Sequence, residues 1–396
     1  MQLAPQQISA IDQIKAWRRN SGSQIFRLFG YAGTGKTTLA KYIAQDCRLP
    51  LFCAFTGKAA YVLRQKGCEA YTIHQLIYCP QERSKRRLQE LEAELADTDD
   101  PTKIELLEKQ INEEHKKLNS PKFTLNQDSP IRDADLVIVD EVSMVNEQMA
   151  QDLMSFGVDI LVLGDPAQLP PVFGTGYFIN AQPDFMLTDI HRQARENPII
   201  RLATSIRQQQ APSPDGDMVV SWGSITPEEV LSYEQILVGK NDTKKATNFR
   251  VRGLLNRQSD LPEPGDRLVC LRNDHEVGLL NGAIWTVDTC YDCGKEHFKG
   301  PDTVDLILRS DDAQCVAVEA HKHHFVTRDD TQLPWWIRKE AQEFDYGYAL
   351  TVHKSQGSQW DSVLVFDESS VFGRDRHKWL YTAVTRAAEK LKLVVR

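Results

Sequence analysis

The 396-residue sequence is poor in cysteine, has no long apolar run and has no excess of basic residues. Its 8 cysteines are scattered, which excludes a small domain held together by disulfides. No stretch reaches the roughly 18 apolar residues that a membrane-spanning helix needs, and the N-terminus lacks the basic-then-apolar order of a secretory signal. The 47 Lys and Arg against 55 Asp and Glu give a net charge of −8, which argues against binding nucleic acid by bulk charge but not against a local basic groove. We expect a soluble, cytoplasmic protein with reduced thiols and no membrane contact.

Short apolar runs that alternate with helix-like stretches predict an α/β fold. The N-terminal half holds four such runs, at Ile25–Phe29, Leu51–Phe55, Leu136–Val139 and Ile160–Leu163. Runs that are apolar throughout are typical of a parallel sheet covered by helices on both faces. Ser362–Phe366 and Leu391–Val395 repeat the pattern, with a helix predicted over about 377–389 between them. The length and the pattern therefore predict two α/β lobes.

Two segments do not follow this alternation. Residues 81–118 hold 8 basic and 11 acidic residues, with Leu and Ile in heptad-like steps. They predict two antiparallel helices, which are either a charged solvated hairpin or an arm for a protein partner. Ile77–Tyr78 and Phe123–Leu125 are predicted to form the stem of this hairpin. Residues 261–336 hold short strand-like runs joined by Gly, Asn and Pro turns, which predict a small inserted β-barrel.

The strongest motif follows the first predicted strand and precedes a helix. Gly30–Thr37 reads GYAGTGKT, which satisfies the pattern G-x-x-x-x-G-K-[ST] of a phosphate-binding loop. Gly30, Gly33 and Gly35 allow the backbone to wrap a phosphate closely. Lys36 is expected to neutralise the β- and γ-phosphates, and the Thr37 hydroxyl to bind Mg²⁺. ATP hydrolysis is the reaction that this motif favours.

Polar residues end two further predicted strands. Asp140 and Glu141 follow the apolar run 136–139, and we expect Asp140 to hold Mg²⁺ and Glu141 to polarise an attacking water. Gln168 follows the run 160–163 and precedes Pro170 and a second proline, so it is placed to sense the γ-phosphate.

Taken in order, these motifs resemble those of superfamily 1 helicases of the RecD-like and Dda-like subgroup. The resemblance covers nearly the whole chain, because further segments match the Q motif and motifs Ia to VI: Leu3–Ala10, Phe55–Ala60, Thr72–Leu76, Val139–Met144, Gly164–Pro171, Leu187–Gln193, Ala349–Gly357 and Tyr381–Ala387.

The resemblance implies an α/β fold of two RecA-like lobes with ATP between them. The implied first lobe spans residues 1–76 and 121–189, and the second spans 190–260 and 337–396. A helical hairpin at 77–120 is inserted in the first lobe, and an SH3-like β-barrel at 261–336 is inserted in the second.

The resemblance also implies the roles of particular residues. Arg192 and Arg386 are implied arginine fingers that reach the γ-phosphate from the second lobe. The implied ATP-binding residues are Gln7 (which would read the adenine), Gly30, Gly33, Gly35, Lys36, Thr37 and Thr38. The expected nucleic-acid contacts are Thr56, Lys58 and His74 on the first lobe, with Thr351, His353, Lys354 and Ser355 on the second.

The implied function is that of an ATP- and Mg²⁺-dependent DNA helicase or translocase, monomeric, moving 5′→3′ on single-stranded DNA and acting at duplex junctions. Two alternatives stay open: an RNA helicase, and an ATP-gated nucleic-acid-binding module that recruits a partner through the helical arm.

The sequence departs from the family at two places and holds one unrelated pattern. Gln359 stands where RecD-like proteins usually have Glu, and the hairpin at 81–118 replaces the tip of the pin that splits the duplex. Cys290, Cys293 and His297 have the residue types of a zinc site, although a single C-x-x-C is weak evidence and reduced thiols are the simpler interpretation.

Overall fold

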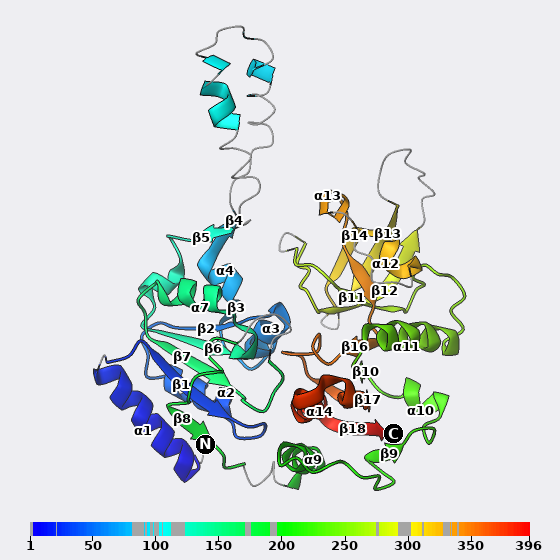
Figure 1. The fold of residues 1–396 in the computed structure, drawn as a ribbon, viewed down its shortest axis with the longest axis horizontal. Coiled ribbons are helices and arrows are strands. Elements are labelled where there is room, and N and C mark those ends of the chain that lie inside the picture. Colours follow the sequence, from blue (N-terminus) through cyan, green and yellow to red (C-terminus); the bar gives the residue numbers. More distant parts are fainter. Residues whose placement is uncertain are drawn as a thin grey trace.

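The computed structural model describes residues 3–20, 22–80, 123–170, 176–190, 196–274, 277–291, 302–310, 313–327, 333, 335–338 and 340–396, with 91, 93–95, 98, 103–104 and 106–111. Three sheets of five or six strands organise this part of the chain. Two of them form lobes that lie side by side, and the third lies next to the second lobe (Figure 1).

The first lobe is built on a parallel six-stranded sheet of order β3-β2-β6-β7-β1-β8. Its strands are β1 (Ile25–Gly30), β2 (Pro50–Ala54), β3 (Ala70–Thr72), β6 (Leu136–Asp140), β7 (Ile160–Gly164) and β8 (Phe185–Leu187). Its helices are α1 (Pro5–Asn20), α2 (Lys36–Ala44), α3 (Gly57–Gln65), α4 (Ile73–Ile77) and α7 (Glu147–Met154).

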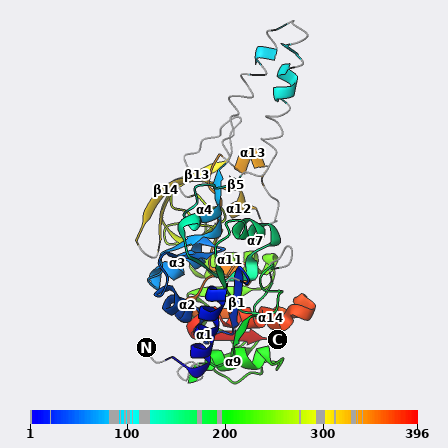
Figure 2. The same cartoon turned by 90° about the vertical axis from the view of Figure 1, so that its left-hand side faces the viewer.

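Both faces of this sheet are buried, as its apolar strands predict. Phe26 and Leu28 pack in one core with α1, α2 and α3, whereas Ile25 and Phe29 pack in another with α4 and α7. Figure 2 shows α1, α2 and α3 along one side of the molecule. The carboxyl ends of β1, β6 and β7 therefore meet at one edge, where the predicted site residues follow.

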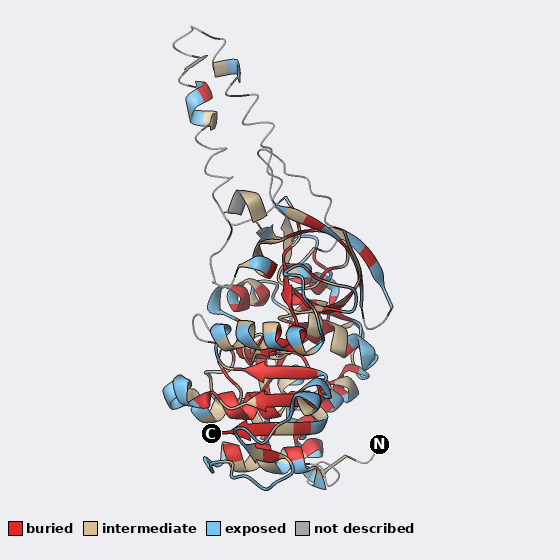
Figure 3. Cartoon of the chain, turned by 90° about the vertical axis from the view of Figure 1, so that its right-hand side faces the viewer, coloured by how far each residue is buried: buried red, intermediate tan, exposed pale blue. Residues whose placement is uncertain are grey.

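The second lobe is also a parallel sheet, of order β16-β10-β17-β18-β9. Its strands are β9 (Val219–Ser221), β10 (Gln235–Val238), β16 (Ala349–Thr351), β17 (Trp360–Phe366) and β18 (Ala387–Val395). Its helices are α9 (Pro198–Arg207), α10 (Pro227–Leu231), α11 (Asn241–Leu254), the 3-10 segment η3 (Ser369–Asp375) and α14 (Arg376–Val384). Figure 3 shows its buried central strands between more exposed helices.

The helix predicted over 377–389 is shorter in the structure. Helix α14 ends at Val384, and Ala387 already pairs with Trp360 as the first residue of β18. Residues 388–389 lie at a register shift between the Ala387 and Lys390 pairs, so strand pairing overrides the local helical pattern.

The third sheet is antiparallel, of order β14-β13-β12-β11-β15. It comprises β11 (Arg267–Cys270), β12 (Ile284–Tyr291), β13 (Thr303–Arg309), β14 (Cys315–His321) and β15 (Phe344–Tyr346). The short helices α12 (His323–Val326) and α13 (Trp335–Arg338) lie between β14 and β15 in the chain. Strand β15 lies beyond the predicted end of the insertion at residue 336, and it leads directly to β16 of the second lobe.

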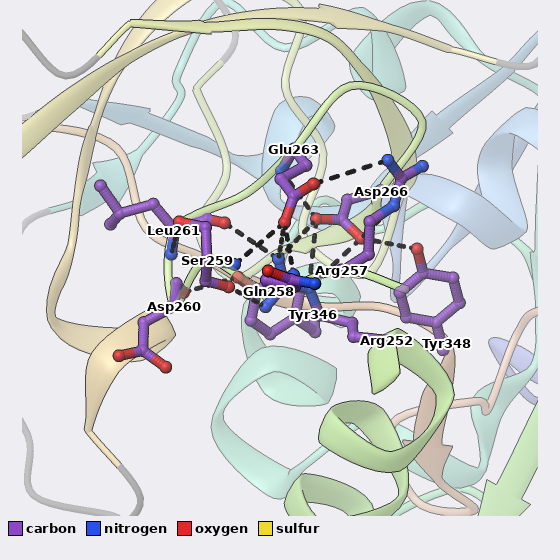
Figure 4. Close-up of polar contacts among 10 residues, drawn as sticks. All are labelled: Arg252, Arg257, Gln258, Ser259, Asp260, Leu261, Glu263, Asp266, Tyr346 and Tyr348. Carbon is purple, nitrogen blue, oxygen red and sulfur yellow. Dashed lines mark hydrogen bonds and ion pairs between the residues drawn. The ribbon is translucent and has the colours of Figure 1, made fainter. Parts of the chain in front are cut away.

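A buried polar cluster joins this sheet to α11 of the second lobe (Figure 4). Arg252, 3% exposed, donates from Nε to both carboxylate oxygens of Asp266 at 3.1 and 3.3 Å, and Asp266 is 0% exposed. The Tyr348 hydroxyl donates to Asp266 at 2.7 Å, and the Arg252 guanidinium lies 4.3 Å from the ring centre of Tyr346. The antiparallel sheet is thus fixed to the second lobe.

The predicted hairpin stem is confirmed in part: β4 (Tyr78–Pro80) and β5 (Phe123–Leu125) pair antiparallel, whereas Ile77 is the last residue of α4. Most of the predicted arm at 81–118 lies outside the described residues. The described ones at 91, 93–95, 103–104 and 106–111 are helical, with Leu91 and Leu107 buried and Lys103 paired with Glu94 at 3.0 Å. In the described part of the chain, no helix has the length and apolar character to cross a membrane.

Candidate active site and nucleic-acid interface

The loop from Gly30 to Lys36 joins β1 to α2 with the backbone that its glycines predict. Gly33 and Gly35 have φ of 80° and 78°, a region that residues with a side chain seldom adopt. A Cβ on Gly30 would lie 2.7 Å from the Thr34 hydroxyl and 2.8 Å from Leu187 Cβ. The three predicted glycines are therefore required by this loop.

Lys36, Thr37 and Asp140 form a polar group at the edge of the sheet. The Lys36 ammonium folds over the loop and donates to the carbonyls of Gly30 at 2.6 Å and Tyr31 at 3.2 Å. Thr37 Oγ1 donates to Asp140 Oδ2 at 3.0 Å. A hydroxyl and a carboxylate oxygen in contact match the oxygen ligands that Mg²⁺ prefers.

Glu141 is half-buried and held in a strained backbone conformation. Its φ of 53° and ψ of 48° are left-handed, and its amide donates to Asp140 Oδ1 at 2.8 Å. Burial raises the pKa of the Glu141 carboxyl, while Arg386 and Lys36 oppose this shift. Backbone strain and a raised carboxyl pKa in one residue are typical of a catalytic base.

These residues line a cavity of about 210 Å³ between the lobes, called here the nucleotide cavity. The first lobe contributes Gly33, Lys36, Thr37, Asp140, Glu141, Ser143, Asp165 and Gln168, and the second contributes Gly357, Ser358, Gln359 and Arg386. Of the predicted catalytic residues, only Arg192 is not located, because it lies outside the described residues.

Two buried polar atoms in this cavity lack partners among the described residues. Gln168 Oε1 and Ser143 Oγ are both without a hydrogen bond. Because buried polar atoms are nearly always paired, these two fit a site that receives a polar ligand. One of these two unpaired oxygens thus belongs to Gln168, the predicted γ-phosphate sensor. Sequence reasoning did not select Ser143, although it stands two residues after Glu141 in the same motif.

Arg386 enters the cavity from the turn after α14. It is 5% exposed, its Nε donates to the Thr382 carbonyl at 3.1 Å and its Nη1 to the Ser358 carbonyl at 3.2 Å. A guanidinium with planar, fixed donors suits the charge that develops in phosphoryl transfer.

Gln7 and Thr38 lie outside the nucleotide cavity. Gln7 is 2% exposed, accepts from the Ala4 amide at 3.1 Å and donates to the Thr34 carbonyl at 3.3 Å, so it braces the phosphate loop in this structure. Thr38 lines a separate open hollow with Lys41 and Lys66 that adjoins the cavity at Thr37.

A second cavity of about 240 Å³, called here the interlobe cleft, contains five of the seven predicted nucleic-acid contacts. Its lining includes Thr56, Lys58 and His74 from the first lobe, His353 and Lys354 from the second, and Asn273, Asn281 and Gly282 from the antiparallel sheet and its loops. The two asparagines were not predicted, because only the fold brings them beside Lys354.

Lys354 links the second lobe to the antiparallel sheet across this cleft. Its ammonium donates to Asn281 Oδ1, and the Asn281 amide donates to Asn273 Oδ1 at 2.7 Å. Burial lowers the pKa of Lys354. The neighbouring His353 ring lies 5.4 Å from the Phe372 ring, and burial lowers the pKa of His353 too.

Two predicted contacts do not line the interlobe cleft among the described residues. Ser355 is 0% exposed and donates its hydroxyl to the Val352 carbonyl at 2.7 Å, so it has no surface for a bound strand. Thr351 Oγ1 accepts from the Lys354 amide at 3.3 Å and is absent from the cleft lining among the described residues. Both hydroxyls stabilise the turn that presents Lys354, a role that a motif match does not distinguish from direct contact.

The predicted zinc pattern is not assembled by the described residues. Cys293 and His297 lie outside them, and the part of the chain that is described contains no group of three His, Cys, Asp or Glu side chains suited to a metal ion.

Comparison with known proteins identifies the family. A model of the AAA domain family matches residues 2–222, more than half of the chain, and a model of the UvrD-like helicase C-terminal domain matches residues 346–394. The chain belongs to the AAA domain family.

Relatives and solved structures extend this likeness over the whole AAA-domain protein. An ATP-dependent RecD2 DNA helicase of Deinococcus radiodurans is 28% identical over 425 residues, which cover 98% of this chain and 48% of the relative. The chain therefore spans about half the length of that curated relative.

Two solved structures share the fold at low sequence identity. Pif1 of Bacteroides bound to single-stranded DNA superposes with a TM-score of 0.56 at 18% identity, covering 99% of this chain and 92% of that one. Pif1 of Candida albicans superposes with a TM-score of 0.52 at 18% identity, covering 100% and 95%.

Proposed function

We propose that this protein is an ATP-dependent DNA helicase that moves along single-stranded DNA. The observation that carries the proposal is the nucleotide cavity, where Lys36, Asp140, Glu141 and Gln168 of one lobe meet Arg386 of the other. Because the catalytic site is divided between two lobes, it is complete only when the lobes are correctly placed relative to each other. Turnover is therefore coupled to lobe movement.

The residues of the cavity have distinct roles in hydrolysis. Lys36 leaves its two carbonyl partners and neutralises the β- and γ-phosphates, and Gln168 hydrogen-bonds to the γ-phosphate. Glu141 accepts the proton of the attacking water, and Arg386 donates to the oxygens that gain charge. A Mg²⁺ ion held by Thr37 and Asp140 would neutralise charge on the phosphates.

The interlobe cleft is the proposed path of the strand. Lys58, His74, His353 and Lys354 supply cations and ring donors, while Asn273 and Asn281 supply amides from the antiparallel sheet. Such groups contact phosphates and bases without reading sequence, as a translocating motor requires. The cleft and the nucleotide cavity share Ser358, so the second lobe contributes one short segment to both.

The insertions belong to the same proposal. We assign residues 261–336, with β15, to an SH3-like domain above the strand path, and residues 77–120 to a hairpin that separates the duplex or docks a protein. The resemblance to RecD-like proteins supports movement in the 5′→3′ direction. It also supports a protein that acts as a monomer.

The test is a comparison of ATPase rates and strand separation. We expect ATP hydrolysis to be stimulated by single-stranded DNA more than by RNA, and a 5′-tailed duplex to be unwound in preference to a 3′-tailed one. A variant lacking residues 81–118 should keep DNA-stimulated hydrolysis and lose unwinding if the hairpin is the wedge. Equal rates with no polymer, DNA and RNA would reject the motor and favour an ATP-gated binding module.

A further inference from the structure

The hydroxyl of Tyr381 joins three segments that form the nucleotide cavity. Tyr381 lies on α14 and is 1% exposed. Its oxygen accepts from the backbone amide of Ala32, in the phosphate loop, at 2.8 Å. The same hydroxyl donates to Asp165 Oδ2, at the end of β7, at 2.7 Å. One side chain of the second lobe therefore holds two loops of the first.

The hydrogen-bond direction in this chain is determined by the chemistry of its members. The Ala32 amide is only a donor, so the hydroxyl accepts there and its single proton goes to Asp165. Asp165 Oδ1 accepts from the Ala167 amide at 3.0 Å, so both its oxygens are paired. Burial, and then the Asp165 charge, hold the pKa of Tyr381 well above its usual range, which keeps the hydroxyl protonated.

The residue after Tyr381 adds a second contact across the lobes. Thr382 Oγ1 accepts from the Leu169 amide at 2.9 Å, and the Gln356 side chain donates to the Leu169 carbonyl at 2.8 Å. Leu169 directly follows Gln168, so the second lobe holds the backbone beside the predicted γ-phosphate sensor.

Arg386 is carried by the same helix. Its Nε donates to the Thr382 carbonyl at 3.1 Å, which ties the guanidinium to the last turn of α14. A displacement of α14 relative to the phosphate loop is therefore passed on to the guanidinium. Displacements of about 1 Å at a reacting group are enough to cost on the order of 100-fold in rate.

We infer that Tyr381 is a positioning residue for ATP hydrolysis, whose hydroxyl sets the placement of Arg386 against the phosphate loop. The inference rests on the proposed function, since it assigns Tyr381 a part in that same reaction. A merely structural Tyr381 would stabilise the fold without affecting the chemical step in particular, and the two roles give different kinetics.

The test is Tyr381→Phe, which keeps the ring and removes the hydroxyl. We expect kcat of DNA-stimulated ATP hydrolysis to fall about tenfold or more, with KM for ATP changing less than about threefold, because the loss belongs to the transition state. Thr382→Val, which removes the other acceptor at almost constant volume, should lower kcat in the same sense and serves if Tyr381→Phe does not fold.

Tyr348→Phe is the matched control. The Tyr348 hydroxyl also donates a hydrogen bond to a buried carboxylate, that of Asp266, at 2.7 Å. Tyr348 and Asp266, however, belong to the junction of the second lobe and the antiparallel sheet. Tyr348→Phe should lower the melting temperature about as much as Tyr381→Phe does. It should leave kcat within about twofold of the parent, because Tyr348 touches no group of the nucleotide cavity.

A double-mutant cycle separates positioning from general destabilisation. In an Arg386→Ala background, Tyr381→Phe should cost less than about twofold in kcat, because the residue that it positions is gone. The inference is overturned if Tyr381→Phe hydrolyses ATP like the parent, or if the two losses multiply in full. A parent protein without ATPase activity would instead reject the proposed function, and the inference with it.

Discussion

At the scale of single residues, the proposed chemistry depends on side chains in unusual surroundings. Glu141 has a left-handed backbone and is half-buried, and Gln168 and Ser143 each bury an unpaired oxygen. Each of these features costs folding free energy. They gather in one cavity, where a bound nucleotide and its water would supply the missing partners.

Glu141→Gln tests the proposed base. The amide keeps the shape but does not accept a proton, so ATP binding should persist while kcat falls about 100-fold or more. Burial raises the pKa of Glu141, and a base works only when deprotonated, so the parent rate should fall on acidification at a pH above the usual range of a glutamate. ATPase pH profiles of both proteins check this, and an unchanged kcat would remove Glu141 as the base.

Lys354→Ala tests the proposed strand path. Loss of one phosphate contact should weaken binding to single-stranded DNA about equally for all sequences, and lower the slope of log K against log salt by about 0.7. Binding titrations at several salt concentrations measure both. Lys15→Ala is the control for net charge. Lys15 lies on α1, pairs with Asp46 at 2.7 Å and does not line the cleft. Equal slopes for both variants would contradict the assignment.

At the scale of elements, α11 and the antiparallel sheet behave as one unit. Asp266 accepts from Arg252, from the Glu263 amide at 2.7 Å and from Tyr348, so its carboxylate is the centre of the junction in Figure 4. Arg252 also donates to the carbonyls of Ser259 at 2.7 Å and Leu261 at 2.9 Å, which anchors the loop between the helix and β11. Movement of the second lobe must therefore carry the sheet with it.

Asp266→Asn should destabilise this junction strongly. The variant removes the closest carboxylate from the buried Arg252 and leaves it only Glu263, at 3.7 Å, which we expect to cost about 3 kcal/mol in free energy of unfolding. Urea unfolding measures the loss. Asp288→Asn breaks the more exposed pair with Arg309, at 2.9 Å, and should cost no more than about 1 kcal/mol. Similar losses for both variants would show that the junction is not a buried ion pair in solution.

At the scale of the whole molecule, the antiparallel sheet reaches across to the first lobe. Leu280 precedes Asn281 and packs against the start of α3, where a Cβ on Gly57 would lie 2.9 Å from Leu280 Cδ2. On the second lobe, Gly357 has a φ of 75° and lies against Thr56 of the first lobe. A Cβ on Gly357 would lie 2.8 Å from the Thr56 hydroxyl. The proposed strand path is thus enclosed by three units that touch through glycines.

Gly57→Ala should open this contact. The added methyl group displaces Leu280 and with it Asn281, so we expect affinity for single-stranded DNA to fall about threefold or more, through a clash of about 1–3 kcal/mol. Adding Leu280→Ala should restore affinity by making room. Gly253→Ala in α11, where an added Cβ meets nothing within 4 Å, is the matched control and should bind like the parent. Failure of Leu280→Ala to rescue would show that the clash is not the cause.

The parts that could be predicted from sequence are those in which neighbouring residues act together. The phosphate loop, the Asp140–Glu141 pair and the apolar parallel strands are local patterns, because backbone geometry within a few residues decides them. The early end of the helix predicted over 377–389, and the positions of Thr351 and Ser355 outside the interlobe cleft, were not predicted for the opposite reason. Pairing with Trp360 and a turn hydrogen bond to Val352 decide those residues, and neither partner is visible in the local pattern.

The sequence by itself determined the fold class, the phosphate-binding loop and the acidic pair, because these follow from the size, charge and spacing of adjacent side chains. Only the tertiary structure decided which distant groups meet: Asn281 with Lys354, and Tyr381 with Ala32 and Asp165. The physical reason is the range of the interactions. A hydrogen bond acts over about 3 Å, so its partner is known only after the chain has brought the two groups together.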